Sequence, residues 1–276
     1  MLGYPYEQSI RSVLPLCDEF VVNVGVSRDD TLERVQAIDS SKIRIVKTEW
    51  NEKLRVRGFV YAQQKMIAQY TCTGDWLFYL EADEVVHEKD LPKIRSAMER
   101  HLDDPRVEAL VFDYYHFYGN TNTCAWSPAW YRRAPRVIKS SIRSYAPDGL
   151  YWMVLDKSNR VARYPQAALI GAHMYHYGWA RSPEQFKAHR EQVAPLWGKA
   201  PESNVPDFAE IDVRILRRFE GTHPEVIQGF FPQEEGPYQP NPDHKLTRRE
   251  RRHRIQLLFE RLLGIETSRK HYRLVR

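Results

Sequence analysis

The chain has 276 residues, of which 42% are hydrophobic, and this length is enough to bury a substantial core. Its three cysteines lie far apart without CxxC or Cys/His spacing, which argues against a disulfide framework or a zinc site and favours a reducing cytoplasm. No apolar run approaches the roughly 20 residues of a membrane span, and the first residues lack the pattern of a signal peptide. The composition therefore predicts a soluble, cytoplasmic protein.

The formal net charge is +5, and much of the excess lies in a basic segment from His244 to Arg276. Such a segment can bind nucleic acid, anionic lipid or a polyphosphate, or it can be the solvated face of a terminal helix. The sequence has no helix–turn–helix, RNP-like or zinc motif, which disfavours nucleic acid. Peripheral contact with the inner face of a membrane stays open.

The first 112 residues alternate between helical and strand patterns. Apolar residues at helical spacing predict helices over 7–14, 31–38, 58–70 and, after a capping Asp90, 91–102. Apolar, β-branched runs predict strands over 20–24, 42–46, 76–80 and 107–112. This alternation predicts an α/β fold with a mostly parallel, Rossmann-like sheet, helices on both faces, and ligands at the carboxyl ends of the strands.

The second half of the sequence is less regular. It is aromatic and proline-rich from Tyr114 to about Pro135, then shows mixed strands to about Trp179, and then helices. Segments 199–207 and 232–243 have the composition of surface connections. We expect a nucleotide-sugar-binding half over 1–115, an acceptor-side half of the same domain over 116–198, and a C-terminal extension with a basic helix over 199–276.

A cluster of acids, Glu81-Ala82-Asp83-Glu84, follows the third predicted strand, which we expect in the centre of the sheet. Because side chains alternate along an extended segment, Glu81 and Asp83 should point the same way. Two carboxylates aimed at one spot are costly unless a cation joins them, and Mg²⁺ or Mn²⁺ held together with substrate phosphates would do so. The alternative is that these acids cap the next helix or lie solvated in a loop.

Three stretches of the sequence carry a family resemblance. They are Gly74-Asp75-Trp76 through Glu84, residues 18–22 leading to Ser27-Arg28-Asp29-Asp30-Thr31-Leu32, and Arg57-Gly58. Over roughly residues 4–102 the chain resembles family 2 glycosyltransferases of the GT-A fold, with looser likeness at residues 176–179 and in the basic tail. The resemblance implies transfer of a sugar from a nucleotide-diphosphate sugar to an acceptor hydroxyl of a glycan, a lipid-linked molecule or a small molecule.

The resemblance also implies site residues. Asp83 would bind the metal and the diphosphate, Glu81 would support it, and Asp29 and Arg57 would lie near the nucleotide. Glu81 stands where aspartate is more usual, and the acid often found in the stretch 24–26 is missing. The family's first strand should precede Gly3, so we expect one wall of the nucleotide pocket to be incomplete.

Two further candidates lie late in the sequence. Alternation along a strand places His173, Tyr175 and Tyr177 on one face and His176 on the other. The resemblance points to His176 as a metal ligand, while a hydrogen-bonded structural histidine is the alternative. Asp148, before Gly149, is the candidate general base for the acceptor hydroxyl, or an ordinary turn residue.

An aromatic and basic segment is the candidate acceptor platform, because aromatic faces stack on sugars and guanidinium groups hold phosphates. Its members are Trp126, Trp130, Tyr131, Arg132, Arg133 and Arg136. A packed aromatic loop with solvated arginines is the alternative. Two functions follow: an inverting, metal-dependent transferase, or a truncated transferase-like scaffold that its basic tail attaches to an anionic surface.

Overall fold

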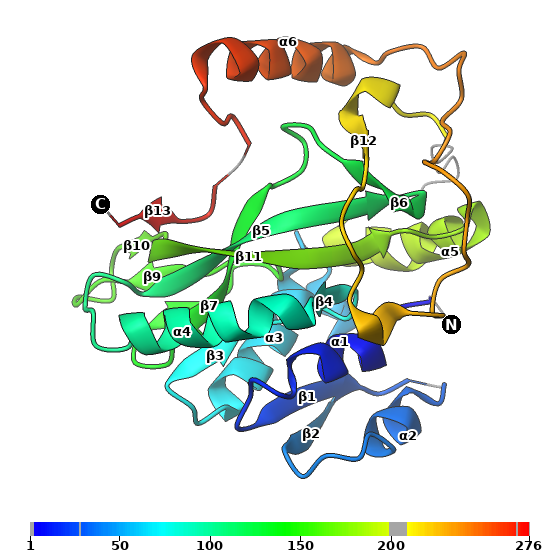
Figure 1. The fold of residues 1–276 in the computed structure, drawn as a ribbon. Helices are drawn as coiled ribbons and strands as arrows, with labels where there is room; N and C mark the ends of the chain where they lie inside the picture. Colours follow the sequence, from blue (N-terminus) through cyan, green and yellow to red (C-terminus); the bar gives the residue numbers. More distant parts are fainter. Residues whose placement is uncertain (1–2, 28, 199–208, 269, 276) are drawn as a thin grey trace.

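The computed structural model describes residues 3–27, 29–198, 209–268 and 270–275, so the predicted connection at 199–207 lies outside the described residues (Figure 1). The N-terminal part alternates helices and strands as predicted. Its elements are α1 (Tyr6–Val13), β1 (Phe20–Gly25), α2 (Thr31–Gln36), β2 (Ile43–Thr48), α3 (Phe59–Thr71), β3 (Trp76–Phe78), β4 (Glu84–Val86) and α4 (Leu91–His101). The short 3₁₀ helices η1 (Glu52–Leu54) and η2 (Glu88–Asp90) lie between them.

The second part is richer in strands than the sequence indicates. It contains β5 (Ala109–Tyr118), β6 (Asn120–Ala125), β7 (Arg133–Lys139), β8 (Ser144–Tyr145), β9 (Met153–Leu155), β10 (Ala162–Arg163), β11 (Gln166–Trp179), α5 (Pro183–Val193), η3 (Ala194–Trp197), η4 (Val213–Ile215), β12 (Leu216–Arg218), η5 (Glu225–Ile227), α6 (Arg248–Leu263) and β13 (Arg273–Leu274). The expectation of an irregular segment from Tyr114 to Pro135 is wrong over β5 and β6, while residues 126–132 do lie outside helices and strands. Aromatic residues pack well on a pleated surface, so the aromatic run simply extends β5.

The main sheet is largely antiparallel, and the prediction of a mostly parallel sheet is wrong. β5 pairs parallel with β11, but β6 and β7 pair antiparallel with β5, β3 pairs antiparallel with β7, and β4 pairs antiparallel with β11. A strand covered on both faces is apolar whichever way its neighbours run, so the apolar runs do not report direction. Figure 1 shows β5 and β11 side by side across the middle of the molecule.

β1 and β2 form a separate, two-stranded parallel sheet. Among the described residues β3 pairs with β7 alone, so β3 is an edge strand and not the centre of a sheet that includes β1 and β2. β1 and β3 instead line one cavity together. The acids after β3 therefore lie at the wall of a cavity, as expected. They lie there because β3 is an edge strand facing the cavity, and not because it is the central strand of a parallel sheet.

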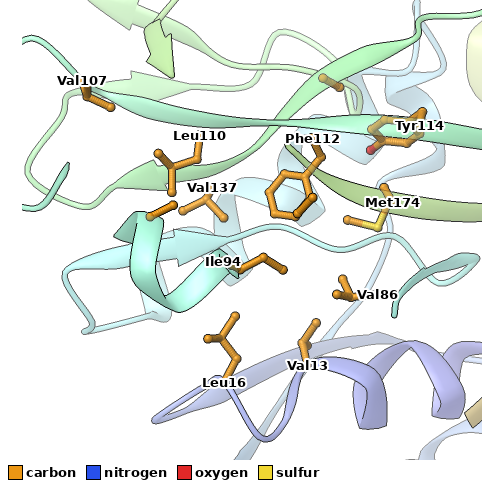
Figure 2. Packing of buried hydrophobic residues seen from close by; sticks show 13 residues of the cluster. Val13, Leu16, Val86, Ile94, Val107, Leu110, Phe112, Tyr114, Val137 and Met174 are labelled. Carbon is orange, nitrogen blue, oxygen red and sulfur yellow. The ribbon is translucent and has the colours of Figure 1, made fainter. Parts of the chain in front are cut away.

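The largest core cluster joins the main sheet to α1 and α4. Figure 2 shows Ile94 of α4 between Val13 and Leu16 on one side and Leu110 and Phe112 of β5 on the other. Ile94, Leu110 and Phe112 are fully buried. Burial of a side chain of this size stabilises the fold by about 1.5–3 kcal/mol, so this cluster fixes α4 on the sheet.

Asp90 does not cap α4 as predicted. Its side chain makes no cap hydrogen bond and instead accepts hydrogen bonds from the backbone N–H of His173 and from Lys93 Nζ, both at 2.9 Å. The carboxylate thus joins the start of α4 to β11.

The basic C-terminal helix is confirmed as α6, which lies along the top of the molecule in Figure 1. A capping box between Thr247 and Glu250 begins it, and Gly264 in the left-handed conformation ends it. Within the described residues, no helix is both long and apolar enough to cross a membrane.

Candidate active site

A cavity of about 1610 Å³ lies between the β1–β2 unit and the main sheet. Its lining includes β1, the end of β3 with Glu81 and Asp83, part of α3, and His176 of β11. Ligand pockets for small molecules usually measure about 300–1,000 Å³, so this cavity is larger than such a pocket requires.

The acids after β3 form a tight turn and not the extended segment that alternation requires. The Glu84 N–H donates to the Glu81 carbonyl at 3.0 Å, and the Glu81 N–H donates to Glu84 Oε2 at 3.2 Å. The prediction that Glu81 and Asp83 point the same way assumed an extended segment, and that assumption is wrong. The two carboxylates have different partners.

Arg136 is the buried cation that balances this turn. Its side chain is fully buried, with Nη2 at 2.5 Å from Glu84 Oε1 and 3.0 Å from Glu81 Oε1. It also donates to the Leu150 carbonyl at 3.1 Å and to the Tyr114 hydroxyl. Arg136 is therefore neither solvated nor free to hold a phosphate of an acceptor, the two alternatives that the sequence left open, but holds the turn in place.

The three acids differ in ionisation because their surroundings differ. Burial raises the pKa of Glu81, and burial together with the nearby Glu84 raises the pKa of Asp83 to about 6. Burial alone would also raise the pKa of Glu84, but Arg136 outweighs it and holds that pKa below its ordinary value. Glu84 is thus a structural anion, while Glu81 and Asp83 face the cavity.

Asp83 and His176 face each other across a small gap. Asp83 Oδ1 lies 3.7 Å from His176 Nε2, beyond hydrogen-bond distance, and Arg181 Nη2 lies 3.9 Å from Oδ2. The Tyr177 N–H donates to the Asp83 carbonyl at 2.8 Å and fixes the turn against β11. A Cβ on Gly178 would lie 2.6 Å from Asp83 Oδ2 and 2.8 Å from His176 Nε2, so glycine keeps this gap open.

The hydrogen bonds of His116 fix the tautomer of His176. His116 Nε2 lies 2.7 Å from the Tyr131 carbonyl, which only accepts, so this nitrogen carries the proton. Burial lowers the pKa of His116 to about 3 and that of His176 to about 4, so both rings are neutral at pH 7. His116 Nδ1 therefore accepts from His176 Nδ1–H at 3.1 Å, which leaves a lone pair on His176 Nε2, facing Asp83.

This arrangement fits a divalent cation. Above the pKa of Asp83 two lone-pair donors face each other without a proton between them, and the second nitrogen of His176 is hydrogen-bonded, as is usual for a metal-ligating histidine. The described residues contain no group of three or more His, Cys, Asp or Glu side chains placed to hold a metal. Asp83 and His176 thus suit Mg²⁺ or Mn²⁺, which take most remaining ligands from phosphate and water.

The other end of the cavity is aromatic. Trp50 and Tyr61 pack edge to face with ring centroids 5.5 Å apart, and Tyr61 lies 6.0 Å from Trp197. Beside them two polar side chains line the cavity, where Asn23 Nδ2 donates to Gln64 Oε1 at 2.9 Å. These residues offer aromatic faces and polar groups for a nucleobase. The sequence reasoning missed them, because Trp50 and Trp197 are far apart in the chain and have no recognisable spacing.

Lys65 of α3 is a second missed residue. It is buried in the cavity wall, where Nζ lies 4.0 Å from the ring centroids of Tyr79 and Trp152 and has no hydrogen-bond partner among the described residues. Burial lowers its pKa, and the nearby Arg136 lowers it further. In the sequence, Lys65 could have been noticed as a lysine on the buried face of a predicted helix.

The predicted nucleotide and base residues have different positions. Asp29 is exposed on the cavity lining, where its Oδ1 accepts from Ser27 Oγ at 2.7 Å. Arg57 is exposed in a turn with φ of 48° and lies outside the cavity lining, which includes Arg55. Asp148 is half-buried and accepts from the Leu150 N–H at 2.8 Å, next to the cavity-lining Gly149.

The structure separates the predicted acceptor residues. Trp130 lines the cavity and packs against His116, with ring centroids 5.2 Å apart. Trp126 and Arg132 lie outside the cavity lining, beneath α6, where Arg132 stacks on Trp126 and pairs with Glu260 at 2.7 Å. Of the predicted acceptor platform, Trp130 and Tyr131 line this cavity.

His173 and His176 lie on opposite faces of β11, as alternation predicted. His173 stacks on Tyr115 with ring centroids 4.8 Å apart and lies outside the cavity lining, while His176 is part of it.

No protein-family model and no curated protein matches the chain. Among solved structures it is similar to S. aureus TarS 1–349, with a TM-score of 0.38, 15% identity, and coverage of 70% of this chain and 62% of that one. The complex of TarS 1–349 with UDP-GlcNAc gives a TM-score of 0.37, 15% identity and coverage of 70% and 64%. TarS itself gives 0.38 and 15%, with coverage of 69% and 37%. The chain spans less than two thirds of each TarS chain, and the similarity is distant.

Proposed function

We propose that this chain is a metal-dependent glycosyltransferase that moves a sugar from a nucleotide-diphosphate sugar to an acceptor hydroxyl. The observation that carries the proposal is the pair formed by Asp83 and His176, two lone-pair donors 3.7 Å apart in the wall of a large cavity. When bound there, Mg²⁺ or Mn²⁺ would neutralise charge on the departing nucleotide diphosphate.

The chain's own residues have separate tasks in this proposal. Asp83 and His176 hold the metal, with Glu81 beside them. Arg181 is buried outside the cavity lining, with Nη2 3.9 Å from Asp83 Oδ2, and in this proposal it adds positive charge next to the metal. Trp50 and the aromatic rings near it take the base, and Asp29 and Arg57 remain the candidates for further nucleotide contacts.

The proposed transfer is inverting. Asp148 takes the proton of the acceptor hydroxyl, whose oxygen forms a bond to the anomeric carbon while the bond from that carbon to the diphosphate oxygen breaks. The electron pair leaves with the nucleotide diphosphate. Trp130 in the cavity is the candidate for stacking on the acceptor, which we propose to be a glycan, a lipid-linked molecule or a small molecule.

The test is turnover of UDP-, GDP- and dTDP-sugars with Mn²⁺ or Mg²⁺ and with the metal removed by EDTA. We expect metal-dependent release of one nucleoside diphosphate, lost in Asp83→Ala and kept in Asp75→Ala, which removes an exposed carboxylate outside the cavity lining. Turnover that survives in Asp83→Ala would refute the proposal. A folded chain that turns over none of these donors would favour the scaffold function.

A further inference from the structure

α6 carries an exposed face that no described residue covers. Apolar residues recur along it at helical spacing: Ile255, Leu258, Phe259, Leu262 and Leu263. Their exposed fractions run from 53% for Phe259 to 69% for Leu262. Soluble chains rarely leave such a row of large apolar side chains in water, so the face requires an occupant.

The same face is basic in its first half. Helical spacing places Arg248, Arg251 and Arg252 in line with the apolar row, and all three are exposed. Arg248 and Arg252 have no ion-pair partner among the described residues, and Arg251 donates to the Leu246 carbonyl at 3.1 Å. Positive charge and apolar surface therefore follow one another along one face, which we call the outer face of α6.

The acids of α6 are turned away from this face and are paired or hydrogen-bonded on the inner side. Glu260 pairs with Arg132 at 2.7 Å, and Glu250 accepts from the Thr247 N–H at 2.8 Å and the Asp212 N–H at 3.0 Å. Arg254, on the inner side, pairs with Asp212 at 2.6 Å. The helix is thus fixed to the body by its inner side, and the outer face has no negative charge of its own.

We propose that the outer face of α6 docks on an anionic lipid bilayer. The apolar half from Ile255 to Leu263 enters the boundary of the acyl chains, and the arginines contact lipid phosphates. A second copy of the chain is a poorer fit, because its outer face has no acid to pair with the arginines. Nucleic acid would leave the apolar half uncovered.

Docking of α6 on a bilayer would also fix the orientation of the cavity relative to the membrane surface. Arg249, the next residue along α6, lines the cavity that contains Asp83 and His176. The helix that contacts the lipid therefore also borders the cavity. The inference does not depend on the proposed transferase activity.

The test is flotation of the full chain with phosphatidylcholine vesicles, with and without phosphatidylglycerol, at low and high salt. We expect binding to the anionic vesicles alone, weakened by salt. Arg248→Gln/Arg251→Gln/Arg252→Gln should weaken binding by about 100-fold, at about 5-fold for each arginine. Leu258→Gln/Phe259→Gln/Leu262→Gln, which keeps every charge, should weaken it by at least about 10-fold.

The matched control removes three exposed basic residues elsewhere: Arg100→Gln/Lys157→Gln/Lys187→Gln. It should bind vesicles as the unaltered chain does, and circular dichroism should show each variant folded. The proposal is overturned if anionic vesicles do not bind, or if the control loses binding as much as the α6 variants. A dimer in sedimentation that the leucine and phenylalanine changes dissolve, or binding of an RNA oligomer in place of vesicles, would also overturn it.

Discussion

Gly178 keeps open the gap between Asp83 and His176, and Gly178→Ala tests whether a cation uses that gap. Contact begins near 3.4 Å, so Asp83 Oδ2 at 2.6 Å from the new Cβ must retreat by about 0.8 Å, and His176 Nε2 at 2.8 Å by about 0.6 Å. Metal–ligand distances tolerate only about 0.2 Å. We therefore expect Gly178→Ala to weaken Mn²⁺ binding by about 10–100-fold, the range seen when the support of a metal ligand is lost.

The assay is titration of Mn²⁺ followed by electron paramagnetic resonance, with and without a nucleoside diphosphate. Gly74→Ala is the matched control, because its Cβ would meet only the Trp76 carbonyl, at 3.6 Å, and the residue is not in the left-handed region. The control should bind Mn²⁺ normally. If Gly178→Ala is folded and keeps its Mn²⁺ affinity within about twofold, the gap is not a metal site.

Four further substitutions probe the surroundings of this gap. Arg136→Met leaves the buried Glu84 unpaired and should lower the free energy of unfolding in urea by about 3–5 kcal/mol. The double variant Arg136→Met/Glu84→Gln should recover part of this loss. If the losses of the two single variants add up in the double variant, the pairing is contradicted. His116→Phe removes the acceptor that sets the neighbouring histidine's tautomer, so Mn²⁺ affinity should fall by about 10–100-fold, and an unchanged affinity would show that the tautomer is set elsewhere. Burial raises the pKa of Asp83 from 3.8 to about 6, so the stability that this group contributes is complete below pH 3.8 and is lost as the pH rises through 6. Without metal, the free energy of unfolding of Asp83→Asn should therefore exceed that of the unaltered chain by up to about 3 kcal/mol at pH 7 and should equal it near pH 3.5. Unfolding curves of the two proteins that coincide at both pH values would contradict this. Lys65→Met replaces a buried amine whose pKa burial lowers, so thermal unfolding should stay the same or move upward, and a clear loss of stability would show that the amine's aromatic contacts matter.

The local elements could be predicted from the sequence because each depends on nearby residues. Ile10 and Val13 of α1 and Ile94 of α4 belong to the helical patterns that predicted those helices, and all three are buried. Strand direction could not be predicted, since it depends on partners far away in the chain. β3 is apolar because Trp76 and Phe78 pack against the core cluster that includes Ile94 of α4, and no local feature shows that its sheet partner β7 runs antiparallel to it.

The candidate site was predictable only in part. Asp83 and His176 were identified, and they do face each other, but the turn that aims Asp83 depends on Arg136, more than fifty residues away in the chain. His116 escaped notice because its role comes from one hydrogen bond to a carbonyl and one to another ring. Pairings between distant side chains are set by the packing of the whole sheet and not by local spacing.

The central claim is that Asp83 and a metal ion hold a nucleoside diphosphate in the cavity. The most direct measurement is calorimetric titration of the chain with UDP, GDP and dTDP, each with and without Mn²⁺, with Asp83→Ala as the comparison. We predict binding of one of these nucleotides that requires Mn²⁺ and is lost in Asp83→Ala. Binding that is the same without Mn²⁺ or in Asp83→Ala, or no binding by the folded chain, would contradict the claim.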